Sequence, residues 1–309
     1  MVVSAEFEAA VESVSNWGRW GADDQRGTLN LITEETRRAG LAAVKDGTAF
    51  NLAMELGLNG PQDGSGVRGR VNPIRTMLAI NDGWSDDPDY VRWSDDIVVT
   101  PIQAATHWDA LSHVSWRGTM YNGIPASAVT TAGATKLGID TWGTLVSHGV
   151  LLDVARHTGV DRVAGGVEIT GDMLEDALQA SGARLLPGSV ALIRTGQVSV
   201  FFAGKVHEYH KDGAGLGISA ARWFHEHDLG AVAIDNTTFD LLPSKEPGVM
   251  LPAHILDLVM MGMPQGQNFV LEELADACAA DGRYEFLIDA TPARFEQSTG
   301  GFVTPVVLR

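Results

Sequence analysis

The chain has a single cysteine, few basic residues and no long apolar segment. Cys278 alone cannot form an internal disulfide framework or a cysteine-built zinc or iron–sulfur site. The 22 basic residues stand against 39 acidic ones, which gives a net charge of −17. A chain this negative repels nucleic-acid phosphates and anionic membrane surfaces, so we expect neither as a partner.

Targeting segments and nucleotide-binding motifs are also missing. No apolar run approaches the ~20 residues needed to span a bilayer, and residues 1–14 lack the basic start of a signal peptide. We therefore expect a cytoplasmic protein. No G-x-G-x-x-G opens a helix after a strand, and neither G-x-x-x-x-G-K-[ST] nor G-x-S-x-G occurs, which argues against nucleotide cofactors and against a serine hydrolase of the α/β type.

What is present is a globular composition, with 45% apolar and 20% charged residues over 309 positions. Glycine is abundant, at 35 residues, which predicts many turns and loops. No repeat or linker divides the chain, so we expect one domain over 1–309. Residues 1–50 would form an N-terminal extension that could contribute to the active site or to an oligomer.

Strand-like and helix-like segments alternate along the chain, which predicts an α/β fold. The expected strands cover 75–80, 97–104, 149–154, 189–194, 230–235, 284–290 and 303–308. The expected helices cover 34–45, 171–181, 220–227 and 271–280, and Thr33, Thr170 and Ser219 are candidate N-caps for the first three.

One segment, Gln103–His113, concentrates polar side chains after a strand-like run. In an extended chain alternate side chains share a face, so Gln103, His107 and Asp109 would project together. An amide oxygen, an imidazole and a carboxylate at one strand end are a plausible partial metal site. A polar strand end with two hydrogen-bonded histidines is the simpler interpretation, and spacing alone does not choose between them.

This segment resembles the motif H-x-G-T-H-x-D-x-P-x-H of the cyclase family, which contains bacterial kynurenine formamidases and isatin hydrolases. Similar resemblances follow in the family's order along most of the chain, at Asn16–Gly21, Asp23–Asn30, Pro187–Gly196, Ile234–Asn236 and Tyr284–Leu287. The resemblance implies a swivelling α/β/α fold with a central mixed β-sheet or barrel flanked by helices. It also implies a divalent-metal hydrolase that acts on amides, lactams or lactones, and a homo-oligomer.

Carried over position by position, the resemblance makes His107 and Asp109 metal ligands and His113 the acid/base. The downstream ligands would be His254 and, in place of the family's glutamate, Gln267. The family's first motif histidine is Gln103 here, so two ligand positions hold neutral amides. Amides bind zinc more weakly than imidazole does, so we expect at most one metal, shifted from Zn²⁺ toward Mn²⁺, and loss of the metal is a real alternative.

Aromatic residues near the motifs are candidates for a wall around a planar, partly apolar substrate. They are Trp17, Trp20, Trp108 and Phe202, and His210 in the His207-x-x-His210 pair is a candidate for the same pocket. Ordinary core packing is an equally good interpretation of each tryptophan. Two other functions remain open: a metal-free cyclase or lyase that uses His113 and Asp109, and a non-catalytic protein that binds a small molecule.

Overall fold

A nine-stranded mixed sheet forms the centre of the computed structural model, which describes residues 3–309. The strands lie in the order β1 (Ala49–Asn51), β15 (Val306–Leu308), β13 (Glu285–Asp289), β7 (Val146–Asp153), β9 (Val190–Arg194), β11 (Ala231–Ile234), β12 (Gln265–Gln267), β4 (His107–Asp109) and β14 (Gly300–Phe302). The four strands from β7 to β12 are parallel, and every other pairing is antiparallel.

The helices account for most of the remaining regular structure. They are α1 (Ala5–Ser13), α2 (Glu34–Ala43), α3 (Val154–His157), α4 (Gly171–Ser181), α5 (Val198–Phe202), α6 (Val206–Lys211), α7 (Ile218–Glu226), α8 (Pro252–His254), α9 (Glu272–Asp281) and a π-helix, Ile255–Met261. Short 3₁₀ turns cover Gly27–Leu31, Tyr121–Gly123, Ala126–Ala128 and Ile139–Thr141.

The predicted caps of α2 and α4 are confirmed, whereas that of α7 is wrong. The hydroxyls of Thr33 and Thr170 accept hydrogen bonds from the third residue of their helices, as N-caps do. The N-cap of α7 is Gly217. Ser219 lies inside the first turn, where its hydroxyl accepts a hydrogen bond from the Gly171 N–H and so ties α7 to α4.

Both faces of the central strands are buried, which explains their continuous apolar sequence. In β7, Val150 and Leu152 pack into a core with α1, α4, α7 and the π-helix. Leu151 points to the opposite face and packs into a second core with α9. The predicted α/β fold with a central mixed sheet flanked by helices is therefore confirmed.

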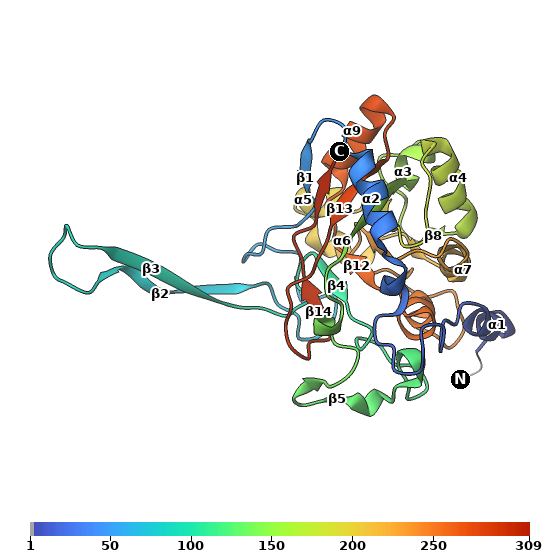
Figure 1. Cartoon of the computed structure of the whole chain (residues 1–309), viewed down its shortest axis with the longest axis horizontal. Coiled ribbons are helices and arrows are strands. Elements are labelled where there is room, and N and C mark those ends of the chain that lie inside the picture. The colour runs from blue at the N-terminus through green and yellow to red at the C-terminus, as the bar shows by residue number, and fades with distance from the viewer. Residues whose placement is uncertain (1–2) are drawn as a thin grey trace.

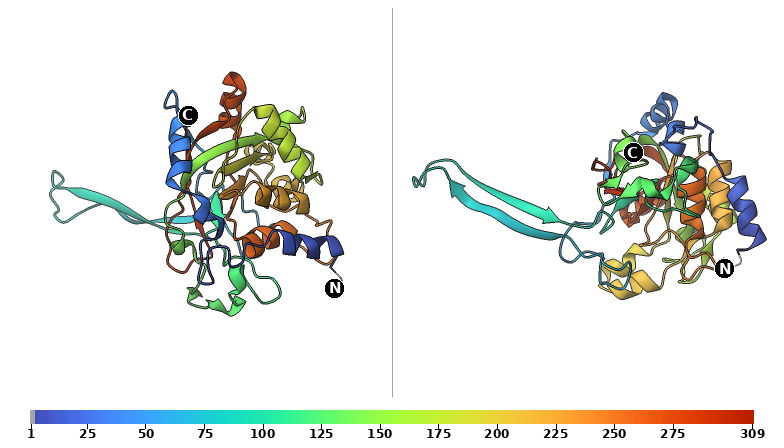
Figure 2. Two further views of the ribbon diagram at one scale, coloured as in Figure 1. Left: turned by 45° about the vertical axis from the view of Figure 1, so that its right-hand side comes forward. Right: turned by 90° about the horizontal axis from the view of Figure 1, so that it is seen from below.

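Two of the predicted strands lie outside the central sheet. The segment expected at 75–80 lies within β2 (Ile74–Gly83), and the segment expected at 97–104 is strand only over 97–99, at the end of β3 (Arg92–Val99); residues 100–104, including Gln103, are not in a strand. β2 and β3 form a two-stranded arm that projects far from the body (Figure 1, Figure 2). Two further pairs are small, β8 (Glu168–Ile169) with β10 (Gly215–Leu216) and β5 (Val129–Thr130) with β6 (Gly133–Ala134). An apolar run predicts a strand, but its partner depends on the rest of the fold.

A buried ion network joins the end of β9 to its neighbours. Arg194 donates to Asp153 at 2.9 Å and to Glu272 at 2.6 Å, and its side chain is almost fully buried. We predict that Arg194→Leu lowers the free energy of unfolding by about 3–5 kcal/mol, because it leaves the buried Asp153 carboxylate without this partner. Denaturant titration measures the change.

Arg38→Ala provides the control for that experiment. Arg38 pairs with Glu34 on the exposed face of α2, and both side chains are at least 75% exposed. Its removal should change the free energy of unfolding by less than about 0.5 kcal/mol. Equal losses in the two variants would contradict the importance of the buried network.

Candidate active site

The strand β4 presents two of the predicted ligands on one face of the sheet. Alternation along β4 places His107 and Asp109 together and turns Trp108 to the opposite face. The antiparallel register with β12 sets Gln267 directly opposite His107. The register thereby brings together polar side chains that are about 160 residues apart in sequence.

Four side chains converge on the fully buried carboxylate of Asp109. Its Oδ1 lies 3.5 Å from Nε2 of His107 and 3.6 Å from Nε2 of His113. Its Oδ2 accepts a hydrogen bond from Nε2 of Gln267 at 2.8 Å and lies 3.7 Å from Nε2 of His254. Burial raises the pKa of Asp109, but the imidazoles of His113 and His107 outweigh it and hold that pKa well below its usual value.

The tautomer of His107 leaves two buried acceptor atoms facing each other, Nε2 of His107 and Oδ1 of Asp109. Its Nδ1 lies 2.7 Å from the Ala105 carbonyl oxygen and donates to it, so its Nε2 carries the lone pair in the neutral ring. Among residues 3–309 neither this Nε2 nor Oδ1 of Asp109 has a hydrogen-bond partner. Two facing acceptors that are buried together fit one cation.

A two-metal centre does not fit these residues. In the described part of the chain, no group of three or more His, Cys, Asp or Glu side chains is placed to hold even one metal ion. The two amide side chains contact different residues of the site. Gln267 contacts Asp109, whereas Nε2 of Gln103 lies 3.5 Å from Nδ1 of His113. Neutral ligands would have to complete the coordination of a single ion bound by His107 and Asp109.

The His254 ring is fixed by Asp240. The Asp240 carboxylate accepts hydrogen bonds from the backbone N–H groups of Ala253 and His254 at the start of α8, and also from Nδ1 of His254. Nε2 of His254 is thereby aimed at Asp109. Burial opposes the charge on His254, but Asp240 and then Asp109 outweigh burial and raise its pKa to about 10.

His113 differs from His254 in its electrostatic environment. Burial lowers the pKa of His113, and the opposing effect of Asp109 does not restore it to its usual value. The ring is therefore neutral at pH 7. A neutral imidazole that reaches a cavity is suited to accept a proton.

A cavity of about 390 Å³ opens over these groups. Asp109, His113, His254 and Gln267 line one side of it, and apolar side chains such as Leu242 and Met250 line another. Asp109 is the only acidic residue among those that line it. This cavity is therefore the candidate site for a small molecule.

Arg70, which the sequence analysis did not single out, lines the same cavity. Its side chain forms no ion pair with any residue in 3–309. Burial lowers its pKa, partly offset by the carboxylate of Asp109. An arginine in a cavity without a carboxylate partner is suited to bind an oxygen-rich or anionic group of a ligand.

The predicted aromatic wall is only partly supported by the positions of its residues. Trp108 is completely buried against Trp142 and Phe269, and its indole N–H donates to the Ala290 carbonyl. The expectation that it contacts substrate is therefore corrected: it is a core residue, because strand alternation turns it away from Asp109.

The other predicted wall residues lie elsewhere. The Trp17 indole donates to the Val259 carbonyl, Trp20 stacks against Arg19, and Phe202 is 60% exposed; none of the three lines the cavity. His210 does line it, and its ring contacts Gly66 and the Pro61 carbonyl. His210 thus holds the loop that leads to Arg70.

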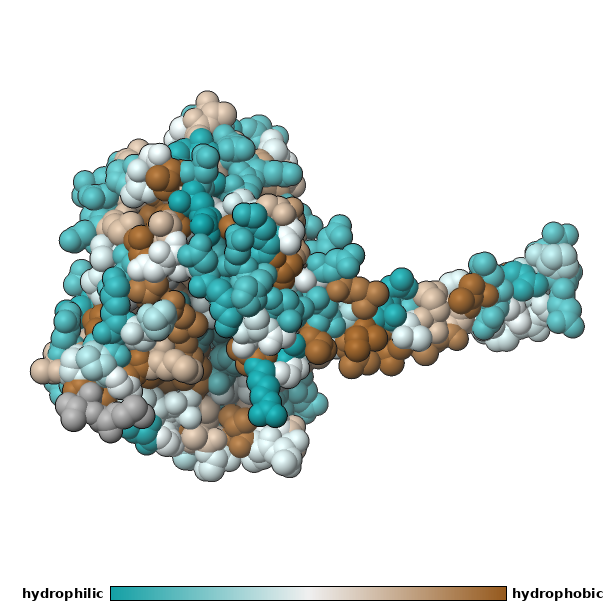
Figure 3. All heavy atoms as spheres, turned by 180° about the vertical axis from the view of Figure 1, so that it is seen from behind, coloured by the Kyte–Doolittle hydropathy of each residue, from teal (hydrophilic) through white to brown (hydrophobic). Residues whose placement is uncertain are grey.

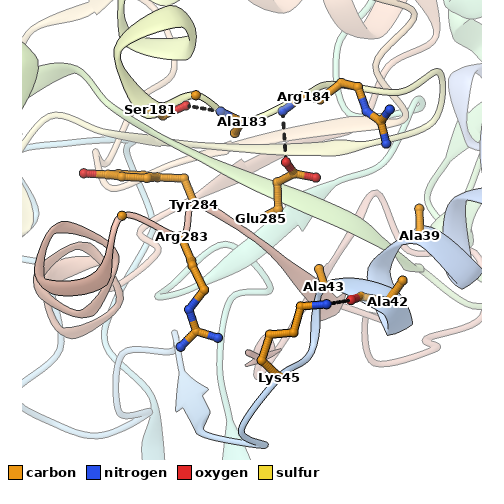
Figure 4. A pocket seen from close by; sticks show the side chains of 12 residues that line it. Ala39, Ala42, Ala43, Lys45, Ser181, Ala183, Arg184, Arg283, Tyr284 and Glu285 are labelled. Carbon is orange, nitrogen blue, oxygen red and sulfur yellow. Dashed lines mark hydrogen bonds between the residues drawn. The ribbon is translucent and has the colours of Figure 1, made fainter.

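A second cavity, of about 380 Å³, lies away from this site (Figure 4). The C-terminal ends of α2, α4 and α9 meet there, together with Lys45, Arg184 and Arg283. Positive side chains at helix C-termini stabilise the unpaired carbonyl groups, as the bond from Lys45 to the Ala42 carbonyl illustrates. These cations are explained by the fold without a ligand.

The fold and the site together define an α/β enzyme-like protein with a buried carboxylate–imidazole cluster under a cavity. A family model described as "Putative cyclase" matches residues 50–241. A solved structure described as a novel cyclase is 34% identical, with a TM-score of 0.85, over 96% of this chain and 100% of that one. The chain belongs to the cyclase family.

More distant solved structures share the fold. Isatin hydrolase A from Ralstonia solanacearum is 17% identical, with a TM-score of 0.63 over 88% of this chain and 95% of that one. A predicted metal-dependent hydrolase from Bacillus stearothermophilus is 15% identical, with a TM-score of 0.52 over 85% and 98%. No curated protein matches the chain. No helix within residues 3–309 has the length and apolar character needed to cross a membrane.

The corrected position of Trp108 leads to a prediction. Trp108→Ala should lower the free energy of unfolding by about 3–5 kcal/mol, because it empties a fully buried site between Trp142 and Phe269. Met250→Ala, at a cavity residue that is 72% exposed, should change it by less than about 0.5 kcal/mol. Thermal and denaturant unfolding compare the two, and a stable Trp108→Ala protein would contradict the core assignment.

Proposed function

We propose that this chain is a hydrolase that opens an amide, lactam or lactone bond of a small substrate in the Asp109 cavity. The proposal depends above all on one observation: Nε2 of His107 and Oδ1 of Asp109 are buried acceptors 3.5 Å apart, without partners among residues 3–309. An isatin hydrolase and a predicted metal-dependent hydrolase have the same fold, which supports the same class of reaction.

One divalent cation, Mn²⁺ or Zn²⁺, would be held by His107 and Asp109, with His254, Gln103 and Gln267 as further candidate ligands. When bound, such an ion lowers the pKa of water and polarises a carbonyl group. Asp109 is the only carboxylate in the cavity lining, and the two amides add no charge, so a single ion is proposed. Oxygen ligands of this kind suit Mn²⁺ better than Zn²⁺.

His113 would act as the acid/base. Its neutral ring takes a proton from the attacking water as the water oxygen bonds to the carbonyl carbon. It then gives that proton to the leaving nitrogen or oxygen as the C–N or C–O bond breaks. A carboxylic acid and an amine or alcohol result, on one molecule if the substrate is a ring.

The rest of the cavity favours a substrate with an apolar body and an oxygen-rich or anionic end. Leu242, Met250 and Val67 supply apolar surface. Arg70 and Lys211 supply positive charge on the same cavity. We propose that Arg70 binds the polar end and thereby directs the scissile carbonyl toward Asp109 and His113.

A metal-free enzyme is the second candidate. Gln267 already donates to Oδ2 of Asp109, and a protonated His254 lies 3.7 Å from the same oxygen, so positive charge is available there without an ion. Asp109 and His113 would then carry out lyase or cyclisation chemistry.

A non-catalytic protein whose degenerate site only binds a small molecule is the third candidate. A cytoplasmic location and a homo-oligomeric state remain our expectations.

The first test separates these functions. We predict that the protein hydrolyses at least one of an aryl formamide, an isatin-like lactam and an aryl lactone, and that a chelator removes the activity until Mn²⁺ or Zn²⁺ is restored. His113→Ala should lower kcat by about 10²–10⁴-fold, because proton transfer is lost. The assay follows substrate absorbance under steady-state conditions.

His207→Ala is the matched control, because His207 lies on α6 with its side chain 71% exposed. It should retain wild-type kcat. Full activity in chelator would favour the metal-free enzyme, and substrate binding without turnover would favour the binding protein.

Arg70 leads to a separate prediction. Arg70→Ala should raise KM by about 10–100-fold with a smaller effect on kcat, since a charged hydrogen bond to the substrate is worth about 1.5–3 kcal/mol. Arg68→Ala, at an exposed arginine on the same loop, should leave KM unchanged. Equal effects of the two substitutions would show that loop charge in general, and not Arg70, determines binding.

A further inference from the structure

Hydrophilic side chains cover much of the visible face of the body (Figure 3), whereas a polar side chain in the interior needs partners there. Asn268, which directly follows Gln267, is only 1% exposed. Its φ of 59° lies in the left-handed region, which asparagine tolerates better than most residues. A buried asparagine in this conformation points to a specific task for its side chain.

Four hydrogen bonds hold Asn268 in place. Its backbone N–H donates to the Asn236 carbonyl at 2.9 Å, and its backbone carbonyl accepts from the Thr106 hydroxyl at 2.6 Å. Its side chain accepts from the Tyr209 hydroxyl at 2.9 Å and donates to the Ala105 carbonyl at 3.1 Å. Two of these bonds therefore tie Asn268 to the two residues that directly precede β4.

The orientation of the Asn268 amide follows from its partners. The Ala105 carbonyl oxygen can only accept, so Nδ2 of Asn268 must face it. Oδ1 then faces the Tyr209 hydroxyl, whose single proton it shares with the Asp235 carbonyl at 3.0 Å. A flipped amide would place two acceptors against each other at Ala105. The network thus permits one orientation of this side chain.

The Ala105 carbonyl oxygen joins Asn268 to His107. It accepts Nδ1–H of His107 at 2.7 Å and Nδ2–H of Asn268 at 3.1 Å, which uses both of its lone pairs. Ala105 precedes β4 and lies outside any strand, so the ladder of the sheet does not set the direction of its carbonyl. The side chain of Asn268 helps to set that direction instead.

The direction of this carbonyl bears on which nitrogen of His107 carries the proton. While Nδ1–H donates to Ala105, Nε2 presents its lone pair toward Oδ1 of Asp109, 3.5 Å away. In the other tautomer Nε2–H would donate to this carboxylate, which is the stronger acceptor because it is charged. The two acceptor atoms that a cation would bind would then be joined to each other. Asp109 therefore favours the tautomer that closes the cation site, and the Ala105 carbonyl opposes it.

We infer that Asn268 is a positioning residue: by holding the Ala105 carbonyl, it keeps His107 in the tautomer whose Nε2 is open to a cation. Asn268 does not line the cavity, so it acts through His107. The part of this inference that concerns the cation rests on the proposed function, whereas the part that concerns the tautomer does not.

Tyr209 connects the same network to the wall of the cavity. It lies on α6, and the next two residues, His210 and Lys211, line the cavity. Its ring packs against Phe201, and its hydroxyl is the donor to Asn268. Tyr209→Phe therefore removes one bond of Asn268 and leaves the packing of α6 in place.

Asn268→Gly tests the inference. Glycine adopts a positive φ without cost, so the backbone keeps its conformation while both side-chain hydrogen bonds are lost. In the metal-free protein, ¹⁵N NMR of the neutral imidazoles should show His107 protonated at Nδ1 in the wild type. Asn268→Gly should shift the ratio of the two tautomers about tenfold toward the Nε2-protonated form. Tyr209→Phe should shift it in the same direction by less, because Asn268 keeps its bond to Ala105.

Ser147→Ala is the matched control. The buried Ser147 hydroxyl donates to the Gly188 carbonyl at 2.8 Å, so this variant also loses a buried bond from a side chain to a backbone carbonyl. Ser147 lies on β7, which three other strands separate from β4. Ser147→Ala should leave the His107 tautomer unchanged, even if it lowers the free energy of unfolding as much as Asn268→Gly does.

The affinity for Mn²⁺, measured by calorimetric titration, is the second readout. Its dissociation constant should rise about 10–100-fold in Asn268→Gly and stay unchanged in Ser147→Ala.

An unchanged His107 tautomer in Asn268→Gly would overturn the inference, and so would an equal shift in Ser147→Ala. A tautomer shift with undiminished Mn²⁺ affinity would overturn the link to the cation. A wild type that binds no Mn²⁺ but shows the predicted tautomer shift would contradict the proposed cation site and support the positioning role of Asn268.

Discussion

The buried carboxylate of Asp109 is the constraint on which the site depends. A charge taken out of water must be compensated by positive or hydrogen-bond-donating groups. Here the amide of Gln267 donates to Oδ2 of Asp109 and the charged ring of His254 lies 3.7 Å from it, whereas Oδ1 faces the lone pair of His107 and is left open. The groups come from two distant segments of the chain, 103–113 and 254–267, and His107 and His254 are oriented by the Ala105 carbonyl and by Asp240. The sheet therefore brings these groups together at one point. Asp109, His113, His254 and Gln267 also line the cavity, so a molecule bound there would contact them.

The three histidines differ in protonation and tautomer because each one contacts different groups. His254 lies between two carboxylates, which favours its charged form, whereas burial keeps His113 neutral. His107 presents a lone pair toward Asp109. One cluster thus contains a ring suited to hold positive charge, a ring suited to exchange a proton and a ring suited to bind a cation, and the proposed hydrolysis uses all three. Because Gln103 and Gln267 are neutral, we propose one ion and not two.

The sequence predicts local features of this protein well and distant ones poorly. Thr33 and Thr170 cap their helices as expected, because a cap depends on neighbours within one turn. Alternation in a strand brought His107 and Asp109 together, and the same rule places Trp108 in the core, which the aromatic-wall hypothesis had neglected. Arg70 and Asp240 have no sequence signal, because their roles depend on loops that only the folded chain brings to the cavity. The arm shows the same limit: its strands could be predicted, but not that they leave the sheet.

Metal stoichiometry tests the central claim most directly. The account predicts about one Mn²⁺ or Zn²⁺ per chain by native mass spectrometry after incubation with the ions, bound through the open atoms of His107 and Asp109. His107→Ala and Asp109→Asn should each lose it, while the exposed control His207→Ala retains it. A chain that binds no ion under these conditions, or two, would contradict the single-cation site.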